Sequence, residues 1–220
     1  MLQKIKIFFN RKTFNSKEYW EARYTSGGNS GSGSYGRLAV FKAQILNKFV
    51  SEKNVHTIIE FGCGDGNQLS MAEYPKYIGL DVSKAIIQTC IKKFQGDSKK
   101  SFFLYDQSCF QDNGKIFSSD VSMSLDVLYH LTEKEVYETY LKQLFSCALK
   151  FVIIYAPNVN IARSSPFSHE FYRKFSDDVE RLAPEWELFE VIENEYKSQN
   201  RYEENCSIAD FYFYRKKESN

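Results

Sequence analysis

The chain has 220 residues, of which 43% are hydrophobic and 26% are charged, and its formal net charge is +1. This length suits one domain with a substantial core, and the composition is that of an ordinary soluble protein. A net charge so near zero gives no argument for a nucleic-acid partner, and no apolar run approaches the roughly 20 residues of a membrane span.

The five cysteines stand far apart in the chain and form no C-x-x-C pair. Their number is odd, so the pattern predicts neither a disulfide framework nor a zinc site. It favours a reducing compartment, and we expect the protein to be cytoplasmic. No compact group of carboxylates indicates a site for another metal ion.

We expect two parts, an N-terminal helical or lid segment at residues 1–50 and one further structural unit at residues 51–220. Lysine and arginine outnumber the acidic residues in the first part. This excess indicates either a solvated basic face or a site for an anionic substrate or partner.

Two helices and a flexible loop are predicted in the N-terminal part. Residues 16–24 predict a short helix that Ser16 can cap. Residues 26–36 (SGGNSGSGSYG) are typical of a flexible loop. Residues 38–49 place apolar side chains near a 3.6-residue period, which predicts a second helix.

A glycine-rich turn between a strand and a helix is predicted at residues 60–67 (EFGCGDGN), which follow the apolar residues Val55, Ile58 and Ile59. Glycines in such a turn let backbone N–H groups approach a ligand that any Cβ would block. The dinucleotide fingerprint G-x-G-x-x-G would need a third glycine where Asn67 stands. The pattern present is E-x-G-x-G-x-G.

Strands and helices alternate after this turn. Strands are predicted at residues 77–82, 101–105, 120–125 and 151–156, and helices at residues 84–94 and 132–149. A T-x-x-E capping box of Thr132 and Glu135 opens the second of these helices. A helix at residues 172–182 and strands at residues 187–192 and 208–214 close the pattern. The fold class is therefore α/β, with ligands binding beyond the carboxyl ends of parallel strands.

Two aspartates end predicted strands. Asp81 stands 17 residues after Gly64, close to the spacing at which an acid accepts from ribose hydroxyls. Its alternative role is that of a helix N-cap before Ser83. Asp106 can accept from an adenine amino group, with Gln107 or Ser108 beside it, although a turn-forming aspartate is the other interpretation.

Four segments together resemble the class I S-adenosylmethionine (SAM) methyltransferases. Residues 60–66 are similar to motif I, residues 79–83 (GLDVS) to motif II, residues 105–108 to motif III, and residues 124–131 (SLDVLYHL) to motif IV. The resemblance implies a Rossmann-like, doubly wound sheet of seven strands, six parallel and one antiparallel, with an N-terminal helical cap. It also implies SAM as cofactor and S-adenosylhomocysteine as product.

Residues 19–24 (YWEARY) resemble an N-terminal segment that closes over SAM in related enzymes, its arginine pairing with the methionine carboxylate. The resemblance also favours a lid or phosphate cradle at residues 26–36. The cofactor contacts that it implies are Tyr19, Arg23, Glu60, Gly62, Cys63, Gly64, Asp81, Val82, Asp106, Gln107 and Asp126.

The acceptor side is predicted after the fourth strand. His130 is the preferred general base, because histidine suits proton transfer near neutral pH, and a histidine that only bonds backbone is the alternative. Asp126 is expected to contact the SAM amino group. Acceptor contacts are expected from Tyr129, His169, Tyr172 and Arg173, although packing and an amphipathic helix start explain these residues equally well.

The function expected from the resemblance is O-methylation of a small polar acceptor. The chain is similar to small methyltransferases of bacterial surface-polysaccharide pathways, which implies a sugar or a phosphoramidate-type group as acceptor. Methylation of a nitrogen on a protein or small amine is one alternative, and a non-catalytic partner subunit with this fold is another. Residues 125–128 (LDVL) lack the N/D-P-P-Y/F motif of base methylation.

Overall fold

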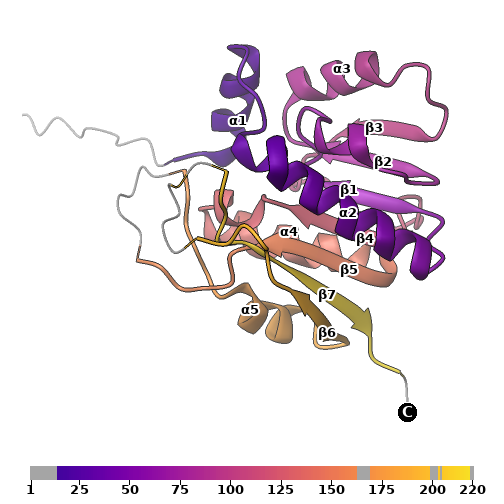
Figure 1. The fold of residues 1–220 in the computed structure, drawn as a ribbon, viewed down its shortest axis with the longest axis vertical. Helices are drawn as coiled ribbons and strands as arrows, with labels where there is room; N and C mark the ends of the chain where they lie inside the picture. The colour runs from indigo at the N-terminus through magenta and orange to yellow at the C-terminus, as the bar shows by residue number, and fades with distance from the viewer. Residues whose placement is uncertain (1–13, 163–168, 199–202, 204, 219–220) are drawn as a thin grey trace, which may run out of the picture.

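The computed structural model describes residues 14–162, 169–198, 203 and 205–218. Its seven strands form one sheet in the order β3-β2-β1-β4-β5-β7-β6 (Figure 1). The strands are β1 (Ile58–Phe61), β2 (Tyr77–Asp81), β3 (Lys100–Leu104), β4 (Ser119–Leu125), β5 (Ala148–Ala156), β6 (Trp186–Ile192) and β7 (Asp210–Lys216). Only β7 runs antiparallel to its neighbours among these strands. The predicted sheet of six parallel strands and one antiparallel strand is confirmed.

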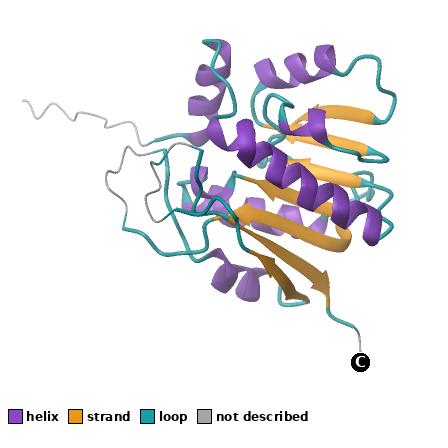
Figure 2. Cartoon of the chain, viewed as in Figure 1, coloured by secondary structure: helices purple, strands orange, loops and turns teal. Residues whose placement is uncertain are grey.

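Helices cover both faces of the sheet (Figure 2). They are α1 (Ser16–Thr25), α2 (Gly36–Glu52), α3 (Lys84–Lys93), α4 (Lys134–Ser146) and α5 (Phe175–Leu182). Short 3-10 turns lie at η1 (Ser32–Ser34), η2 (Gln68–Met71) and η3 (Leu128–His130).

The alternation of β1 side chains explains the two layers. Ile59 and Phe61 pack in one core cluster with residues of α4 and α5, whereas Ile58 packs in the other with residues of α2 and α3. All seven residues of β4 are buried, as expected of a central parallel strand covered on both faces. Each face of the sheet is therefore covered by a hydrophobic core. The carboxyl edge of the sheet remains available for a ligand-binding site.

The capping of two helices differs from the prediction. Asn15, not Ser16, is the N-cap of α1, and its side chain accepts from Glu18 N. Ser16 instead donates its backbone N–H to Glu133 Oε1 at 2.8 Å. Glu133 in turn is the N-cap of α4, and no side-chain hydrogen bond caps that helix. The Thr132–Glu135 capping box is therefore wrong, because the chain at this point is tied to α1.

Other elements also differ from the prediction. Helix α4 ends at Ser146 rather than at residue 149, because Ala148 already pairs with Ser119 of β4. Helix α5 begins at Phe175 rather than at residue 172. The glycine-rich turn leads into the 3-10 turn η2 and not into an α-helix.

Candidate functional site

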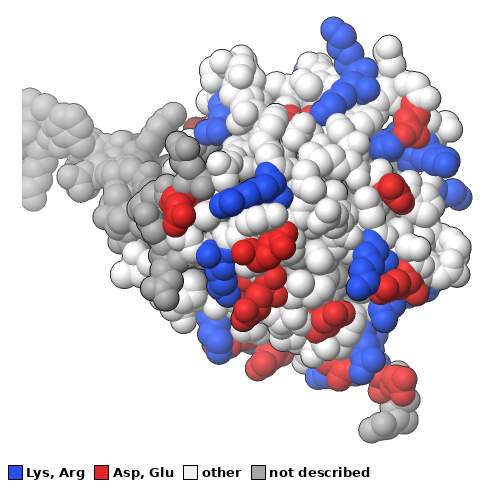
Figure 3. Space-filling model, viewed as in Figure 1, with Lys and Arg blue, Asp and Glu red and all other residues white. Residues whose placement is uncertain are grey.

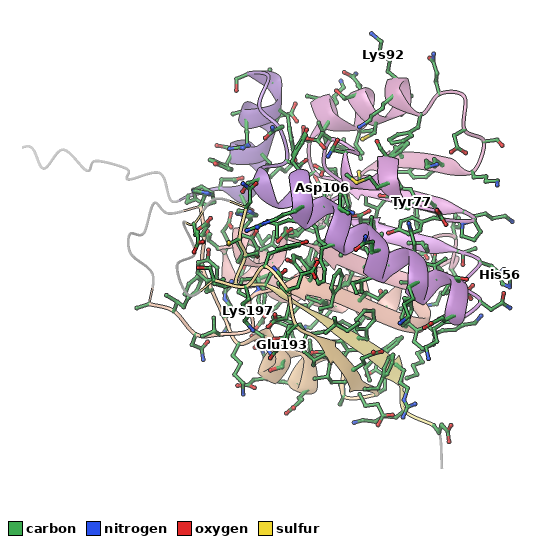
Figure 4. All side chains as sticks on the ribbon, viewed as in Figure 1. His56, Tyr77, Lys92, Asp106, Glu193 and Lys197 are labelled. Carbon is green, nitrogen blue, oxygen red and sulfur yellow. The ribbon has the colours of Figure 1, made fainter. Side chains whose placement is uncertain are left out.

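A cavity of about 240 Å³ lies at the carboxyl edge of the sheet. Its walls come from α1, α2, the segment between them, and the loops that follow β1, β2, β3 and β4. Segments far apart in sequence thus meet at one point. Asp106, labelled in Figure 4, comes from the loop after β3 and lines this cavity.

The glycine loop (residues 62–67) has the backbone conformation that glycine permits. Gly62 has φ +84° and Gly64 has φ +55°. A Cβ on Gly62 would lie 2.5 Å from Val127 Cγ2, and one on Gly64 would lie 2.3 Å from Ser30 Oγ. Another residue at either position would have a strained backbone and a Cβ that clashes with a neighbouring side chain, so both positions require glycine. Both glycines line the cavity.

Asp81 joins the end of β2 to the glycine loop. Its Oδ2 accepts from Gly64 N at 3.1 Å, and its Oδ1 accepts from Ser83 N at 2.9 Å. Ser83, not Asp81, is the N-cap of α3. Burial raises the pKa of Asp81 to about 6, although the backbone donors oppose that rise. The aspartate is free of the capping role and lines the cavity.

Glu60 is a buried acid behind the glycine loop. Tyr77 donates its hydroxyl to Glu60 Oε2 at 2.6 Å. Burial raises the pKa of Glu60 to about 7, against the lowering effect of Tyr77 and Lys42. Near neutral pH this carboxyl group is therefore only partly ionised.

The glycine–serine segment (residues 26–36) is fastened to the glycine loop. Asp65 Oδ2 accepts from Ser30 N at 2.9 Å and from the Tyr35 hydroxyl at 2.8 Å. Asn67 donates its side-chain amide to Ser34 O at 2.6 Å. In the sequence, Asn67 was notable only because it stands where the dinucleotide fingerprint would have its third glycine. In the structure its side chain holds the glycine–serine segment beside the cavity.

Helix α1 borders the cavity with a different face from the predicted one. Trp20 and Tyr24 line the cavity, whereas Tyr19 and Arg23 do not. Tyr19 stacks on His169 with ring centroids 5.1 Å apart. Arg23 donates its Nε to Asn29 O at 2.8 Å. The periodicity of residues 16–24 is weak, so it gave no signal for choosing Trp20 over Arg23.

An ion pair ties α1 to the loop after β3. Lys17 Nζ lies 2.8 Å from Asp106 Oδ2, and both side chains are partly exposed. The hydrogen bonds from Lys17 and Ser108 hold the pKa of Asp106 well below its usual range. Asp106, Gln107 and Ser108 all line the cavity, but the Asp106 carboxylate already has these two partners.

A buried ion pair that the sequence did not predict lies between α2 and the loop after β4. Lys42 Nζ is 2.7 Å from Asp126 Oδ2, with side-chain exposures of 1% and 13%. Both residues line the cavity. A signal was present, because Lys42 stands four residues from both Leu38 and Leu46 on the apolar face of the helix.

His130 lines the cavity at η3. Its Nδ1 lies 3.1 Å from His169 O, and Trp20 packs edge-on against its ring at 4.9 Å. Burial lowers the pKa of His130 to about 4, so the imidazole is neutral near pH 7. A carbonyl can only accept, so Nδ1 carries the proton and Nε2 keeps its lone pair.

The four predicted acceptor residues lie beside His130 and do not line the cavity. Tyr129 donates to Asp126 Oδ1 at 3.2 Å, and Tyr172 stacks on its ring at 5.5 Å. Arg173 donates to Leu131 O and Thr132 O, 2.8 and 2.9 Å away. His169 holds the His130 ring through its carbonyl. In this arrangement all four support the loop that carries His130.

The described residues include no group of three or more histidine, cysteine, aspartate or glutamate side chains placed to hold a metal ion. Within the same part of the chain, none of the helices is long and apolar enough to span a membrane. On the face seen in Figure 3, acidic and basic side chains intermingle over the described surface.

Comparison with known proteins shows the fold. No family model matches the chain. A small RNA 2'-O-methyltransferase of Arabidopsis thaliana is 28% identical over 148 residues, which are 60% of this chain and 16% of that protein. The chain thus spans about a sixth of the length of that curated relative.

Solved structures are similar over most of the chain. The methyltransferase domain of bacterial CtHen1-C has a TM-score of 0.60 at 18% identity, covering 79% of this chain and 96% of that one. The N-methyltransferase NodS of Bradyrhizobium japonicum WM9 with S-adenosylhomocysteine has a TM-score of 0.70 at 14% identity, covering 93% and 100%. Magnesium protoporphyrin IX methyltransferase of Synechocystis PCC 6803 has a TM-score of 0.65 at 16% identity, covering 91% and 98%. The chain has the class I methyltransferase fold, as the sequence predicted.

Proposed function

We propose that this protein is a SAM-dependent methyltransferase that methylates a hydroxyl group of a polar acceptor. One observation carries the proposal: the glycine loop, Asp81 and the neutral His130 all line a single cavity at the carboxyl edge of this fold. The similar structures crystallised with SAM or S-adenosylhomocysteine support the choice of cofactor.

The residues present fit that cofactor. Gly62 and Gly64 line the cavity with positive φ values that other residues rarely adopt, so the loop can bring backbone N–H groups to the ligand. Asp81 is a buried acid whose carboxyl oxygens can accept hydrogen bonds besides those from the backbone, and these lone pairs suit ribose hydroxyls. Gln107 and Ser108 offer polar groups on the adenine side.

When bound, SAM would supply a methyl group on a positively charged sulfur, with which the chain has to align the acceptor oxygen. The chain has to remove the hydroxyl proton and keep water out. His130, whose imidazole is neutral near pH 7, would receive that proton at Nε2. Trp20 and Tyr24 on α1, with the glycine–serine segment, cover the site against solvent.

Two acceptor classes share this hydroxyl chemistry. The sequence resemblance favours a sugar or a phosphoramidate-type group of a surface polysaccharide, although none of the similar proteins is named for a polysaccharide acceptor. The curated relative is named for methylation of the 2'-oxygen of small RNA, which favours a ribose hydroxyl of RNA as the second candidate. The intermingled charges of Figure 3 give that candidate no support on the visible face.

The test is methyl transfer from labelled SAM to a panel of free sugars, sugar phosphates, phosphoramidates and short RNAs, with an amine panel for the nitrogen alternative. His130→Ala should lower the single-turnover rate by roughly 10²- to 10⁴-fold and leave S-adenosylhomocysteine affinity within about threefold. His56→Ala, at an exposed residue, is the matched control. A wild-type rate in His130→Ala eliminates His130 as the base, and transfer to amines alone overturns O-methylation.

A further inference from the structure

The buried ion pair of Lys42 and Asp126 has unused hydrogen-bonding capacity. An ammonium group has three donors. Among the described residues Asp126 Oδ2 is the one acceptor of Lys42 Nζ, and the face of the Tyr155 ring lies 5.1 Å away. The Lys42 residue is 1% exposed, so bulk water does not supply the missing partners. A buried cation with unfilled donors beside a cavity suits an anionic ligand group.

A buried acceptor that has no partner among the described residues lines the same cavity as that cation. Gln68 is 8% exposed, and its Nε2 donates to Ala39 O at 3.0 Å. Its Oε1 has no hydrogen-bond partner in the described part of the chain. Ala39 precedes Lys42 by three residues on α2, so the Gln68 amide and the Lys42 ammonium approach the same helix face. Both side chains line the cavity.

Asp126 adds a negative charge at the same place. Its backbone is in the left-handed region, with φ +58°, and its carboxylate accepts from Lys42 and Tyr129. Gly33 of η1 lies against it, and a Cβ on Gly33 would be 2.8 Å from Asp126 Oδ2. The glycine–serine segment thus closes on this carboxylate only because residue 33 has no side chain.

We propose that Lys42, Gln68 and Asp126 form the receptor for the α-amino acid group of the cofactor. Lys42 donates to its carboxylate, while Gln68 Oε1 and Asp126 accept from its ammonium group. A receptor with both unfilled donors and unfilled acceptors suits a zwitterion better than a ligand of one charge. The inference rests on the proposed function, and it gives Lys42 the role that the sequence resemblance gave to Arg23.

The test compares two ligands that share the adenosine end. S-Adenosylhomocysteine carries the amino acid group and 5'-methylthioadenosine lacks it. In Lys42→Met, affinity for S-adenosylhomocysteine should fall by roughly 10- to 100-fold, as expected for a lost charge-assisted hydrogen bond, with methylthioadenosine affinity changed less than about twofold. Lys48→Met, on the same helix with a side chain 70% exposed, is the control.

Gln68→Met leaves the Lys42–Asp126 ion pair intact. It should also lower the affinity for S-adenosylhomocysteine relative to that for methylthioadenosine, by about three- to tenfold. It decides the question if Lys42→Met does not fold. If the variants lose affinity equally for both ligands, or lose none for either, the proposed amino acid receptor is wrong. Binding of both ligands to the wild type would in that case still support the proposed function. Absence of binding to the wild type overturns the proposed function, and the receptor with it.

Discussion

Replacing Glu60 by glutamine should make the protein more stable at alkaline pH. Burial raises the pKa of Glu60 from 4.5 to about 7, so the folded state holds this proton more tightly than the unfolded state does. The stability that this group contributes is full below pH 4.5 and is lost as the pH rises through 7. Each pKa unit corresponds to about 1.4 kcal/mol, so ionised Glu60 costs the folded state roughly 3 kcal/mol above pH 7.

Glutamine removes that cost and keeps the contact, because its amide oxygen can still accept from the Tyr77 hydroxyl. The free energy of unfolding in urea should therefore be roughly 3 kcal/mol higher for Glu60→Gln than for the wild type at pH 8.5, and most of that gain should vanish at pH 5.

The control is Glu52→Gln, whose side chain is 60% exposed, and it should change the unfolding free energy by less than about 0.5 kcal/mol at both pH values. A gain for Glu60→Gln that is the same at pH 5 and pH 8.5, or a loss at pH 8.5, would refute the reasoning.

Three further predictions concern the cavity and its rim. Gly64→Ala should destabilise the fold by about 1 kcal/mol or more and weaken S-adenosylhomocysteine binding in calorimetry, because φ is +55° and the new Cβ would push Ser30 Oγ away; unchanged affinity would contradict this. Wild-type affinity should fall as the pH drops through about 6, where Asp81 takes up a proton, whereas Asp81→Ala should bind weakly and without that pH dependence. Lys17→Met should cost less than about 1 kcal/mol in thermal unfolding, because its pair with Asp106 is exposed, and a larger loss would mean that α1 is anchored chiefly there.

Local sequence patterns predicted the elements of the site that depend on neighbouring residues. The apolar run before Gly62 marked β1, and the spacing from Gly64 to Asp81 placed the aspartate at the end of β2, where it accepts from Gly64 N. Both follow from strand length and from the rule that ligands lie beyond the carboxyl ends of parallel strands. The number of strands and the presence of one antiparallel strand came from the family resemblance.

Contacts between distant residues were beyond the sequence patterns. Lys42 meets Asp126 across 84 positions and Ser16 meets Glu133 across 117, and the second contact displaced the predicted capping box. A short helix with a weak apolar face gave no basis for turning Trp20, rather than Arg23, toward the cavity. Tertiary packing determines these contacts and the orientation of α1, and it overrides local sequence preferences.

The central claim is that the cavity at the carboxyl edge binds SAM. Isothermal titration of the whole chain with S-adenosylhomocysteine tests it most directly. The account predicts saturable binding of one ligand per chain with a Kd below roughly 100 μM. No binding at millimolar ligand would contradict it.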